Sequence, residues 1–198
     1  MLYRVFRALD GVAPTARGGP LYVPRDRQGA GRHDDPGRYG AFYAARSPVA
    51  AVAESIQAFR GRDISPEDLK LADGSRLALA TYDDSALESL MDLDEPAVLM
   101  EEEWRPSGVA SRDRAITQAM AVRAFEAGAL GLSWWSTLDA AWTNVTLFAE
   151  RTIDPGSLQA EQTVELLAID HRSLVAAADQ LAIPLARGRR RRCPERTG

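Results

Sequence analysis

The sequence predicts an α+β fold built as a single domain. It has 198 residues, of which 45% are hydrophobic and 26% are charged, and this composition is sufficient for one buried core. Segments typical of strands and segments typical of helices both occur, but they do not alternate regularly, as a doubly wound parallel sheet would require. These two observations favour an α+β domain.

The first predicted elements are a short strand and a long loop. Residues 2–6 have a strand pattern, whereas residues 11–40 contain seven glycines and four prolines, a density that disfavours helix and strand. Loops of this length in a compact domain are usually either functional or disordered. The loop also contains five arginines, which suit it to wrapping an anionic small molecule: Arg17, Arg25, Arg27, Arg32 and Arg38.

A strand over residues 41–45 and a helix over residues 48–60 are predicted next. Ser47 is a favourable N-cap, and Pro48 is favourable as the first helical residue. Glu54 lies outside the apolar stripe of this helix, beside alanines that would let another molecule approach its carboxylate. The stripe that we expect to face the core consists of Val49, Val52, Ala53, Ile56 and Phe59.

The middle of the chain is predicted to begin with a polar connection over residues 61–76. Strands are expected over 77–82 and 96–100, separated by an acidic stretch with helical tendency, 84–93, and followed by a polar loop, 101–110.

A second long helix is predicted from about residue 112 to residue 127, because Ser111 is a favourable N-cap and Gly128 is a suitable C-terminal stop. Its buried side is expected to contain Ile116, Ala119, Met120 and Arg123.

The last elements are three strands and a helix. The strands are expected over residues 130–135, 144–150 and 164–169, and the helix from Asp170, as N-cap, to Leu181. The helix residues spaced for burial are Leu174, Val175, Ala178 and Leu181.

Charge divides the chain into a domain, residues 1–186, and a tail, residues 187–198. The net charge is −4, but the tail carries +5 and the domain −9. An acidic domain is a poor binder of nucleic acid, because clustered Lys and Arg supply most of that affinity. The tail, rich in arginine, is expected to be a disordered, solvated end that contacts nucleic acid weakly at most.

The sequence also disfavours a membrane protein, a disulfide-bonded protein and a metalloprotein. No apolar run is long enough to cross a bilayer, and the first residues do not resemble a signal peptide, so a cytoplasmic protein without a membrane partner is expected. The single cysteine, Cys193, excludes an internal disulfide. His33 and His171 lack partners at metal-ligand spacing, so no metal is predicted and His33 is expected in a polar turn.

Two catalytic motifs are disfavoured. Gly29-Ala30-Gly31 begins like a dinucleotide-binding fingerprint, but Asp34 occupies the place of the third glycine and no strand precedes it. A Ser/His/Asp hydrolase is disfavoured because the sequence has no G-x-S-x-G motif.

Residues 31–55 (GRHDDPGRYGAFYAARSPVAAVAES) resemble the signature of the RES domain, which is named for arginine, glutamate and serine. This domain is the toxin half of RES–Xre toxin–antitoxin pairs. Arg32 matches the arginine of the family's Gly-Arg motif, Tyr43 matches the tyrosine of the next strand, and Glu54 matches the glutamate of the next helix.

The family serine matches Ser136. Residues 131–136 (GLSWWS) fit the family's segment of glycine, hydrophobic, aromatic and serine residues, and residues 144–148 (NVTLF) fit the strand that follows it. With the helix around Thr117-Gln118 included, the resemblance covers residues 2–170.

The sequence departs from the family pattern after Arg32. His33 and Asp34 stand where family members often have an aromatic residue and an asparagine.

The resemblance implies an ADP-ribosyltransferase-like fold, in which a central mixed or antiparallel split sheet is flanked by helices. It also implies cleavage of the nicotinamide–ribose bond of NAD+, by hydrolysis or phosphorolysis. NAD+ is then a substrate, and no cofactor is expected. The implied protein partner is a helical Xre-type antitoxin.

The resemblance also implies a role for each matched residue. Arg32 offers a bidentate fork to the NAD+ pyrophosphate, and Tyr43 offers a ring to nicotinamide. Glu54 stabilises the oxocarbenium-like ribose, and Ser136 holds the ribose or the carboxamide. One carboxylate suffices because nicotinamide departs neutral, without the proton that an alkoxide needs. Taken singly, each of the four residues also fits an ordinary structural role.

Two alternatives remain open at this level. The first is transfer of ADP-ribose to a protein. The second is a catalytically silent module that binds NAD+ or a partner, in which the negative charge of Asp34 makes the pocket unsuitable for catalysis.

Overall fold

The structure is a computed structural model that describes residues 1–186, so the expected basic tail lies outside the described residues. The strands are β1 (Leu2–Ala8), β2 (Ala41–Ala45), β3 (Arg76–Asp83), β4 (Leu90–Asp92), β5 (Gly131–Trp135), β6 (Thr143–Phe148) and β7 (Gln159–Leu166). The helices are α1 (Pro48–Ile56), α2 (Pro96–Glu101), α3 (Pro106–Val109), α4 (Arg114–Glu126), α5 (Ala149–Thr152) and α6 (Arg172–Gln180).

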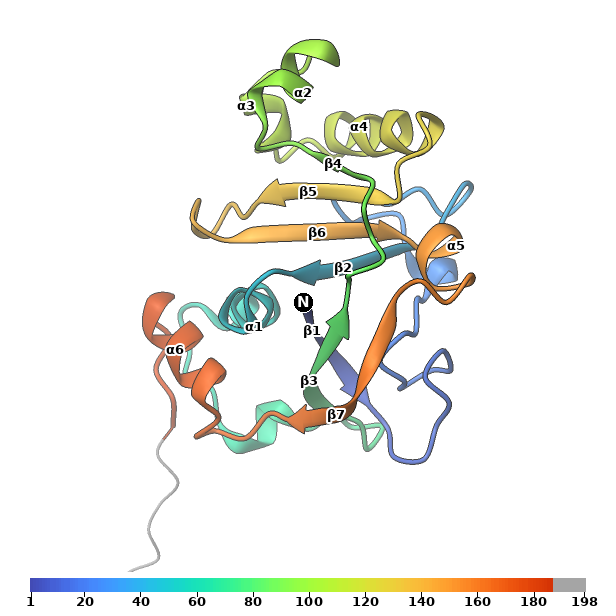
Figure 1. Ribbon diagram of the computed structural model, residues 1–198. Helices are drawn as coiled ribbons and strands as arrows, with labels where there is room; N and C mark the ends of the chain where they lie inside the picture. The colour runs from blue at the N-terminus through green and yellow to red at the C-terminus, as the bar shows by residue number, and fades with distance from the viewer. Residues whose placement is uncertain (187–198) are drawn as a thin grey trace, which may run out of the picture.

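The described strands form one seven-stranded sheet in the order β4-β5-β6-β2-β1-β3-β7. The sheet is mixed, because β4 and β5 are parallel and the other neighbours are antiparallel. Helices flank it on more than one side (Figure 1). The α+β class with a mixed sheet is therefore confirmed.

The sheet splits between β1 and β2. These strands are paired at Tyr3 and Ala45, whereas β1 pairs with β3 along its whole length and β2 pairs with β6 along its whole length. In Figure 1, β5, β6 and β2 run across the view, and β1, β3 and β7 turn steeply away from them. The two halves of the sheet diverge at this point, which opens space beside β2.

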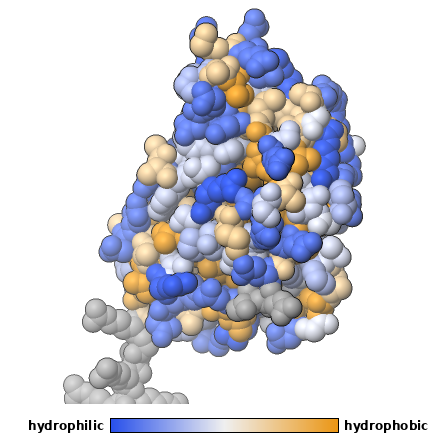
Figure 2. All heavy atoms as spheres, in the orientation of Figure 1, coloured by the Kyte–Doolittle hydropathy of each residue, from blue (hydrophilic) through white to orange (hydrophobic). Residues whose placement is uncertain are grey.

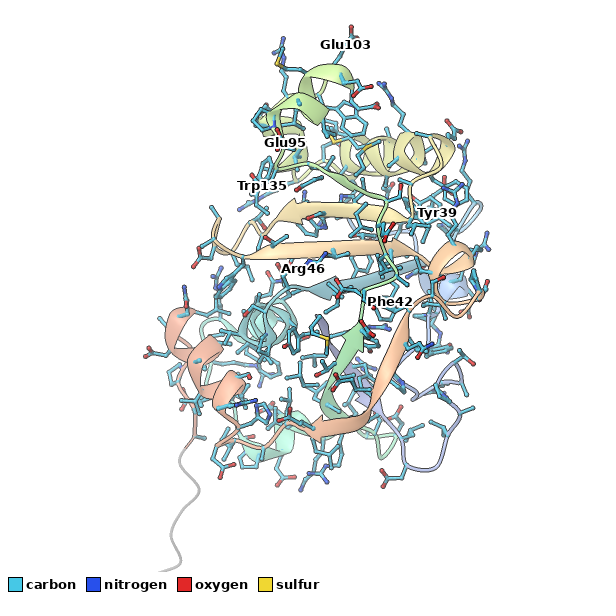
Figure 3. All side chains as sticks on the ribbon, viewed as in Figure 1. Tyr39, Phe42, Arg46, Glu95, Glu103 and Trp135 are labelled. Atoms are coloured by element: carbon cyan, nitrogen blue, oxygen red, sulfur yellow. The ribbon has the colours of Figure 1, made fainter. Side chains whose placement is uncertain are left out.

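Three clusters of buried side chains hold the layers together. On one side, α1 and α6 lie side by side (Figure 1), and Val52 and Ile56 pack with Leu174. A second cluster lies between the sheet and the long loop and contains Phe42, which is labelled in Figure 3. The third joins α2, α3 and α4 to the other end of the sheet, for example through Leu132.

The predicted start of α1 is confirmed. Ser47 is its N-cap, since the Ser47 Oγ accepts hydrogen bonds from the backbone N–H groups of Val49 (3.2 Å) and Ala50 (3.5 Å). The α-helix ends at Ile56, earlier than expected, and residues 57–59 continue as one 3₁₀ turn. Glu54 lies in the second turn of α1, between the N-cap and the 3₁₀ turn.

Two predictions for the middle of the chain were wrong. The acidic stretch 84–93 contains β4 instead of a helix, because residues 90–92 pair in parallel with β5. The apolar run 96–100 is helix α2 instead of a strand. Pro96 is its first residue, and the Glu95 carboxylate accepts a hydrogen bond from the backbone N–H of Ala97.

Helix caps also differ from the predicted ones. Asp113, not Ser111, caps α4, and its carboxylate accepts from the backbone N–H of Ala115 at 3.0 Å. His171, not Asp170, caps α6, through its ring Nδ1 and the backbone N–H of Ser173. Each helix begins one or two residues later than expected, because a residue closer to the first turn takes the capping position.

The buried side of α4 is displaced from the predicted one. Ile116 is 43% exposed and Ala119 is exposed, whereas Met120 is buried as expected. Val175 of α6 is also exposed, at 44%. The residues of α4 that face the protein interior are Thr117, Met120, Ala121 and Ala124. Thr117 is polar, so a pattern of apolar residues does not predict that it is buried. Its burial depends on a hydrogen bond from its hydroxyl to a loop that is distant in the sequence.

Two strand boundaries were also wrong. β6 ends at Phe148, where α5 begins, and β7 begins at Gln159, five residues before the expected start. The early part of β7 is polar and is held by its pairing with the end of β3.

The predicted loop 11–40 is confirmed as a segment without strands; its one helical element is the 3₁₀ turn Arg25–Arg27. Hydrogen bonds order it: Gln28 bridges to the backbone N–H and carbonyl of Ala41, at 2.9 and 2.6 Å. Arg4 of β1 donates to the carbonyls of Pro20 (3.3 Å) and Tyr22 (3.0 Å). The loop is therefore attached to both halves of the split sheet.

The surface of the described residues is mixed in character. Figure 2 shows hydrophilic residues over most of one face, with hydrophobic residues scattered among them. Arg46, labelled in Figure 3, follows β2 and forms an ion pair with Asp84, which follows β3. Among the helices of residues 1–186, none has the length and apolar character needed to cross a membrane.

Candidate active site

A cleft of about 560 Å³ lies beside the split in the sheet. Its walls come from the long loop, β1, β2, α1, the start of α4, and the strands β5 and β6. The polar and aromatic residues that matter for its chemistry are Arg32, Tyr43, Glu54, Arg114, Trp134 and Asn144. Three of the four residues singled out from the sequence, Arg32, Tyr43 and Glu54, thus line one cleft.

Glu54 is the carboxylate of this cleft, and three side chains hold it in place. Its Oε1 accepts hydrogen bonds from the Ser136 Oγ (2.7 Å) and the Asn144 Nδ2 (2.8 Å), and its Oε2 accepts from the Gln57 Nε2 (2.9 Å). Donors to both oxygens fix the orientation of the carboxylate.

Ser136 lies behind Glu54, where it is 2% exposed. Its hydroxyl donates to Glu54 and accepts from the backbone N–H of Leu138 at 3.1 Å. The sequence resemblance suggested that this hydroxyl holds the ribose or the carboxamide. In the structure the hydroxyl donates its hydrogen bond to the Glu54 carboxylate.

Asn144 is a site residue that sequence reasoning did not single out, although it begins the strand segment matched to the family. It is buried on β6, opposite Trp134 of β5, and donates to Glu54. Its Oδ1 is buried and has no hydrogen-bond partner within residues 1–186. Leaving a buried acceptor unpaired costs free energy, so the favourable contact of this side chain is the one that its Nδ2 makes with the Glu54 carboxylate.

Tyr43 presents its ring to the cleft and its hydroxyl to the long loop. The hydroxyl donates to the Asp34 Oδ1 at 2.6 Å and accepts from the backbone N–H of His33 at 3.0 Å. Burial, assisted by the hydrogen bond to Asp34, raises the pKa of Tyr43 well above its usual value. The phenol therefore stays neutral, and it anchors the loop that carries Arg32.

Asp34 organises that loop and is not among the residues that line the cleft. Besides the Tyr43 hydroxyl, its carboxylate accepts from the backbone N–H groups of Gly29 (2.8 Å) and Gly31 (2.7 Å). A Cβ on Gly31 would lie 2.5 Å from the Asp34 carboxylate, so this close approach requires glycine. The acidic residue that departs from the family pattern is thus satisfied inside the protein.

Arg32 lies in the cleft wall with part of its guanidinium already bound. Its Nη1 donates to the carbonyls of Val109 (2.8 Å) and Ser111 (2.9 Å), and the group lies 5.0 Å from the centre of the Trp134 ring. Burial, and then the nearby charge of Arg114, lower the pKa of Arg32. An arginine side chain keeps its proton in proteins, so the group is still charged at neutral pH.

Helix α4 holds the backbone of this loop. The Thr117 Oγ1 donates to the carbonyl of Arg32 at 2.5 Å, and the Gln118 Nε2 donates to the carbonyls of Gly29 (3.0 Å) and Gly31 (2.9 Å). These contacts explain the role of the Thr117-Gln118 pair that the family match contains: both side chains dock the loop.

His33 lies in a turn, as expected, but its side chain is buried in the protein core and not on a polar surface. It is 1% exposed, its Nδ1 lies 2.9 Å from the Thr146 Oγ1, and its ring meets Trp134 edge to face. The hydroxyl of Tyr39, labelled in Figure 3, donates to the His33 carbonyl. Burial, and then the charges of Arg32 and Arg114, lower the pKa of His33 to about 3.

This pKa predicts that acid destabilises the protein through His33. Between about pH 6.5 and about pH 3 the unfolded chain binds a proton at His33 that the folded chain does not, so the free energy of unfolding falls by up to about 1.4 kcal/mol per pH unit. Urea unfolding of the wild type and of His33→Phe, measured from about pH 7.5 to about pH 5.5, checks this. The variant is expected to show the shallower pH dependence, and equal slopes would contradict the prediction.

The described residues contain no group of three His, Cys, Asp or Glu side chains placed to hold a metal ion. His171 contacts Glu165 at 3.1 Å and caps α6. Both contacts of the His171 ring are with other groups of the protein, so its role in the described residues is structural.

Fold and cleft together define an α+β domain in which a carboxylate, fixed by hydrogen bonds, shares a cleft with arginine and aromatic side chains. Residues 1–174 match the family model of the RES domain. This chain therefore belongs to the RES domain family.

A similar fold is found among solved structures. The chain is similar to a chain in the crystal structure of the M. tuberculosis MbcT–MbcA toxin–antitoxin complex, with a TM-score of 0.59 and 20% sequence identity. The similarity covers 91% of this chain and 88% of that chain. No curated protein matches the sequence.

Proposed function

We propose that this RES domain is a toxin that cleaves NAD+ at its nicotinamide–ribose bond. The observation that carries the proposal is the Glu54 carboxylate, which three side chains hold in a cleft that also contains Arg32 and Tyr43. NAD+ is the substrate of this reaction and not a cofactor.

In the proposed reaction each residue of the cleft has a role. The bond between C1″ of the ribose and the nicotinamide nitrogen breaks, its electron pair leaves with neutral nicotinamide, and positive charge develops on the ribose. An oxygen of water, which then loses a proton, or of phosphate forms the new bond to C1″. Glu54 stabilises this charge from a fixed position. The Tyr43 ring provides a surface on which nicotinamide stacks, and the guanidinium of Arg32 binds the pyrophosphate.

Ser136 acts in this proposal as a positioning residue, because its hydroxyl is buried against the carboxylate. Ser136→Ala is expected to lower kcat by about 10- to 100-fold while KM changes little, since the substrate contacts remain but the carboxylate loses one of its two Oε1 donors. Steady-state kinetics of nicotinamide release checks this. A rise in KM at constant kcat would instead show that the hydroxyl binds substrate.

The proposed activity is tested by incubating the purified full-length chain with NAD+, with and without phosphate. Release of nicotinamide is expected, together with ADP-ribose if water is the acceptor or ADP-ribose 1″-phosphate if phosphate is the acceptor. Mass spectrometry distinguishes the two products. No turnover by a folded sample in either condition would overturn the proposal, and transfer of label from NAD+ to a protein band would favour protein ADP-ribosylation.

We also propose a helical Xre-type antitoxin as the partner of this chain. Membership of the RES family and the fold shared with a chain of a toxin–antitoxin complex support this proposal. Co-expression with a helix-turn-helix protein encoded beside this chain is expected to relieve growth arrest and to yield a complex on size-exclusion chromatography. An active toxin whose arrest that neighbour does not relieve would contradict it.

A further inference from the structure

The cleft concentrates positive charge in an otherwise acidic domain. Among the described residues, three arginines line it, Arg4, Arg32 and Arg114, and Glu54 is the one carboxylate that does. Residues 1–186 as a whole carry a formal charge of −9. The excess of cations in the cleft is therefore local, and it suits an anionic ligand.

Two of these arginines are committed to the protein itself. Arg4 donates to the carbonyls of Pro20 and Tyr22, and its guanidinium lies 4.4 Å from the centre of the Phe42 ring. Arg32 uses its Nη1 on two backbone carbonyls and lies over Trp134. All of these hydrogen-bond and ring partners are neutral, and within the described residues neither guanidinium forms an ion pair with a carboxylate; the charge of Glu54 acts on Arg32 only from beyond ion-pair distance.

Arg114 differs from both. Its side chain is exposed at the cleft, and within residues 1–186 its guanidinium makes neither a hydrogen bond nor an ion pair. Its backbone, in contrast, is fixed. It is the first residue of α4, after the N-cap Asp113, and the Ser111 carbonyl just before that cap accepts from Arg32. A rigid backbone therefore presents a free cation.

Arg114 and Arg32 are close enough for their charges to interact, since Arg114, after burial, is a cause of the lowered pKa of Arg32. Two like charges beside one cleft raise the free energy of the empty site. An anion bound between them removes this repulsion, and a pyrophosphate carries the two charges needed to neutralise both.

We propose that Arg114 is a substrate-binding residue that, with Arg32, binds the pyrophosphate of a dinucleotide. This inference rests on the proposed function for the identity of the dinucleotide as NAD+. Arg114 then makes the cleft specific for substrates that carry phosphate groups, because a substrate without phosphate gains no binding free energy from its guanidinium.

Arg114→Gln provides the kinetic test. Its kcat/KM for NAD+ is expected to fall at least about tenfold, mainly through KM, because one charge-assisted contact is lost. Its kcat/KM for nicotinamide riboside, which has no phosphate, is expected to match the wild type. The control is Arg112→Gln, which removes an exposed arginine of the same segment that does not line the cleft. An equal loss on both substrates, or no loss on NAD+, would overturn the proposal.

A binding measurement separates this inference from the proposed function. Calorimetric titration with ADP-ribose requires no turnover, and Arg114→Gln is expected to weaken binding at least about tenfold relative to the wild type and Arg112→Gln. If the wild type cleaves no NAD+ but shows this difference, the anion site stands and the proposed reaction fails. If Arg114→Gln binds ADP-ribose as the wild type does, or the wild type does not bind it, the role of Arg114 is wrong.

Discussion

Glu54→Gln is expected to lower the rate of nicotinamide release by about 10³-fold, the size of effect seen when one preorganised electrostatic contact to a transition state is removed. The substitution preserves the shape of the side chain and removes its charge. The amide no longer opposes the positive charge that develops on the ribose, so the transition state loses its main source of stabilisation. Substrate binding should change much less, because the contacts to the pyrophosphate and nicotinamide are made elsewhere in the cleft.

The same variant is expected to remain folded. The oxygen of the new amide can still accept from Ser136 and Asn144, but its NH₂ group then faces the donor of Gln57. Losing that one hydrogen bond at a partly exposed position costs about 1 kcal/mol.

The matched control is Glu88→Gln, which neutralises an exposed carboxylate outside the cleft. Nicotinamide release and thermal unfolding are measured side by side for the wild type and both variants. If Glu54→Gln retains more than about a tenth of the wild-type rate, the carboxylate is not the group that stabilises the ribose cation.

The elements that the sequence predicted well are those with a local cause. α1 was expected from Ser47-Pro48 and its apolar stripe, and these residues do cap and bury it. The error over residues 84–100 has a different origin. β4 exists because it pairs with β5, which lies about 40 residues later in the chain, and no pattern within β4 itself reports that partner. Pro96, by contrast, was a local helix signal that the apolar run beside it obscured.

The candidate site could be predicted as a set of residues but not as an arrangement. The family resemblance brought Arg32, Tyr43 and Glu54 together, and the structure places them around one cleft. The supporting contacts join segments that are far apart in sequence, such as Asn144 to Glu54 and His33 to Thr146. Contacts of that kind depend on the order of strands in the sheet, which single-sequence patterns do not specify.

Asp34 is the residue for which sequence and structure give opposite predictions. As an unpaired acid beside the pyrophosphate it would repel NAD+, and removing its charge would strengthen binding. In the structure it accepts hydrogen bonds from the Tyr43 hydroxyl and from the backbone N–H groups of Gly29 and Gly31, and it is 6% exposed. These contacts hold the loop from which Arg32 reaches the cleft.

Asp34→Ala is therefore expected to destabilise the protein by about 3 kcal/mol, because three partly buried hydrogen bonds are lost at about 1 kcal/mol each. It is also expected to weaken NAD+ binding, because the loop that carries Arg32 is released. Urea unfolding and calorimetric titration with ADP-ribose measure the two effects.

Asp34→Asn separates charge from hydrogen bonding, because it removes the negative charge and keeps the shape. Its oxygen can still accept from the two glycine N–H groups, but its NH₂ group takes the acceptor position that faced Tyr43, and the phenolic proton loses its partner. We expect a loss of about 1 kcal/mol in stability and weaker binding of ADP-ribose than in the wild type. Tighter binding by this variant would show that the Asp34 charge acts on the ligand, and would favour a silent binding module over an enzyme. Weaker binding would show that the acid serves the cleft by ordering the loop around Arg32.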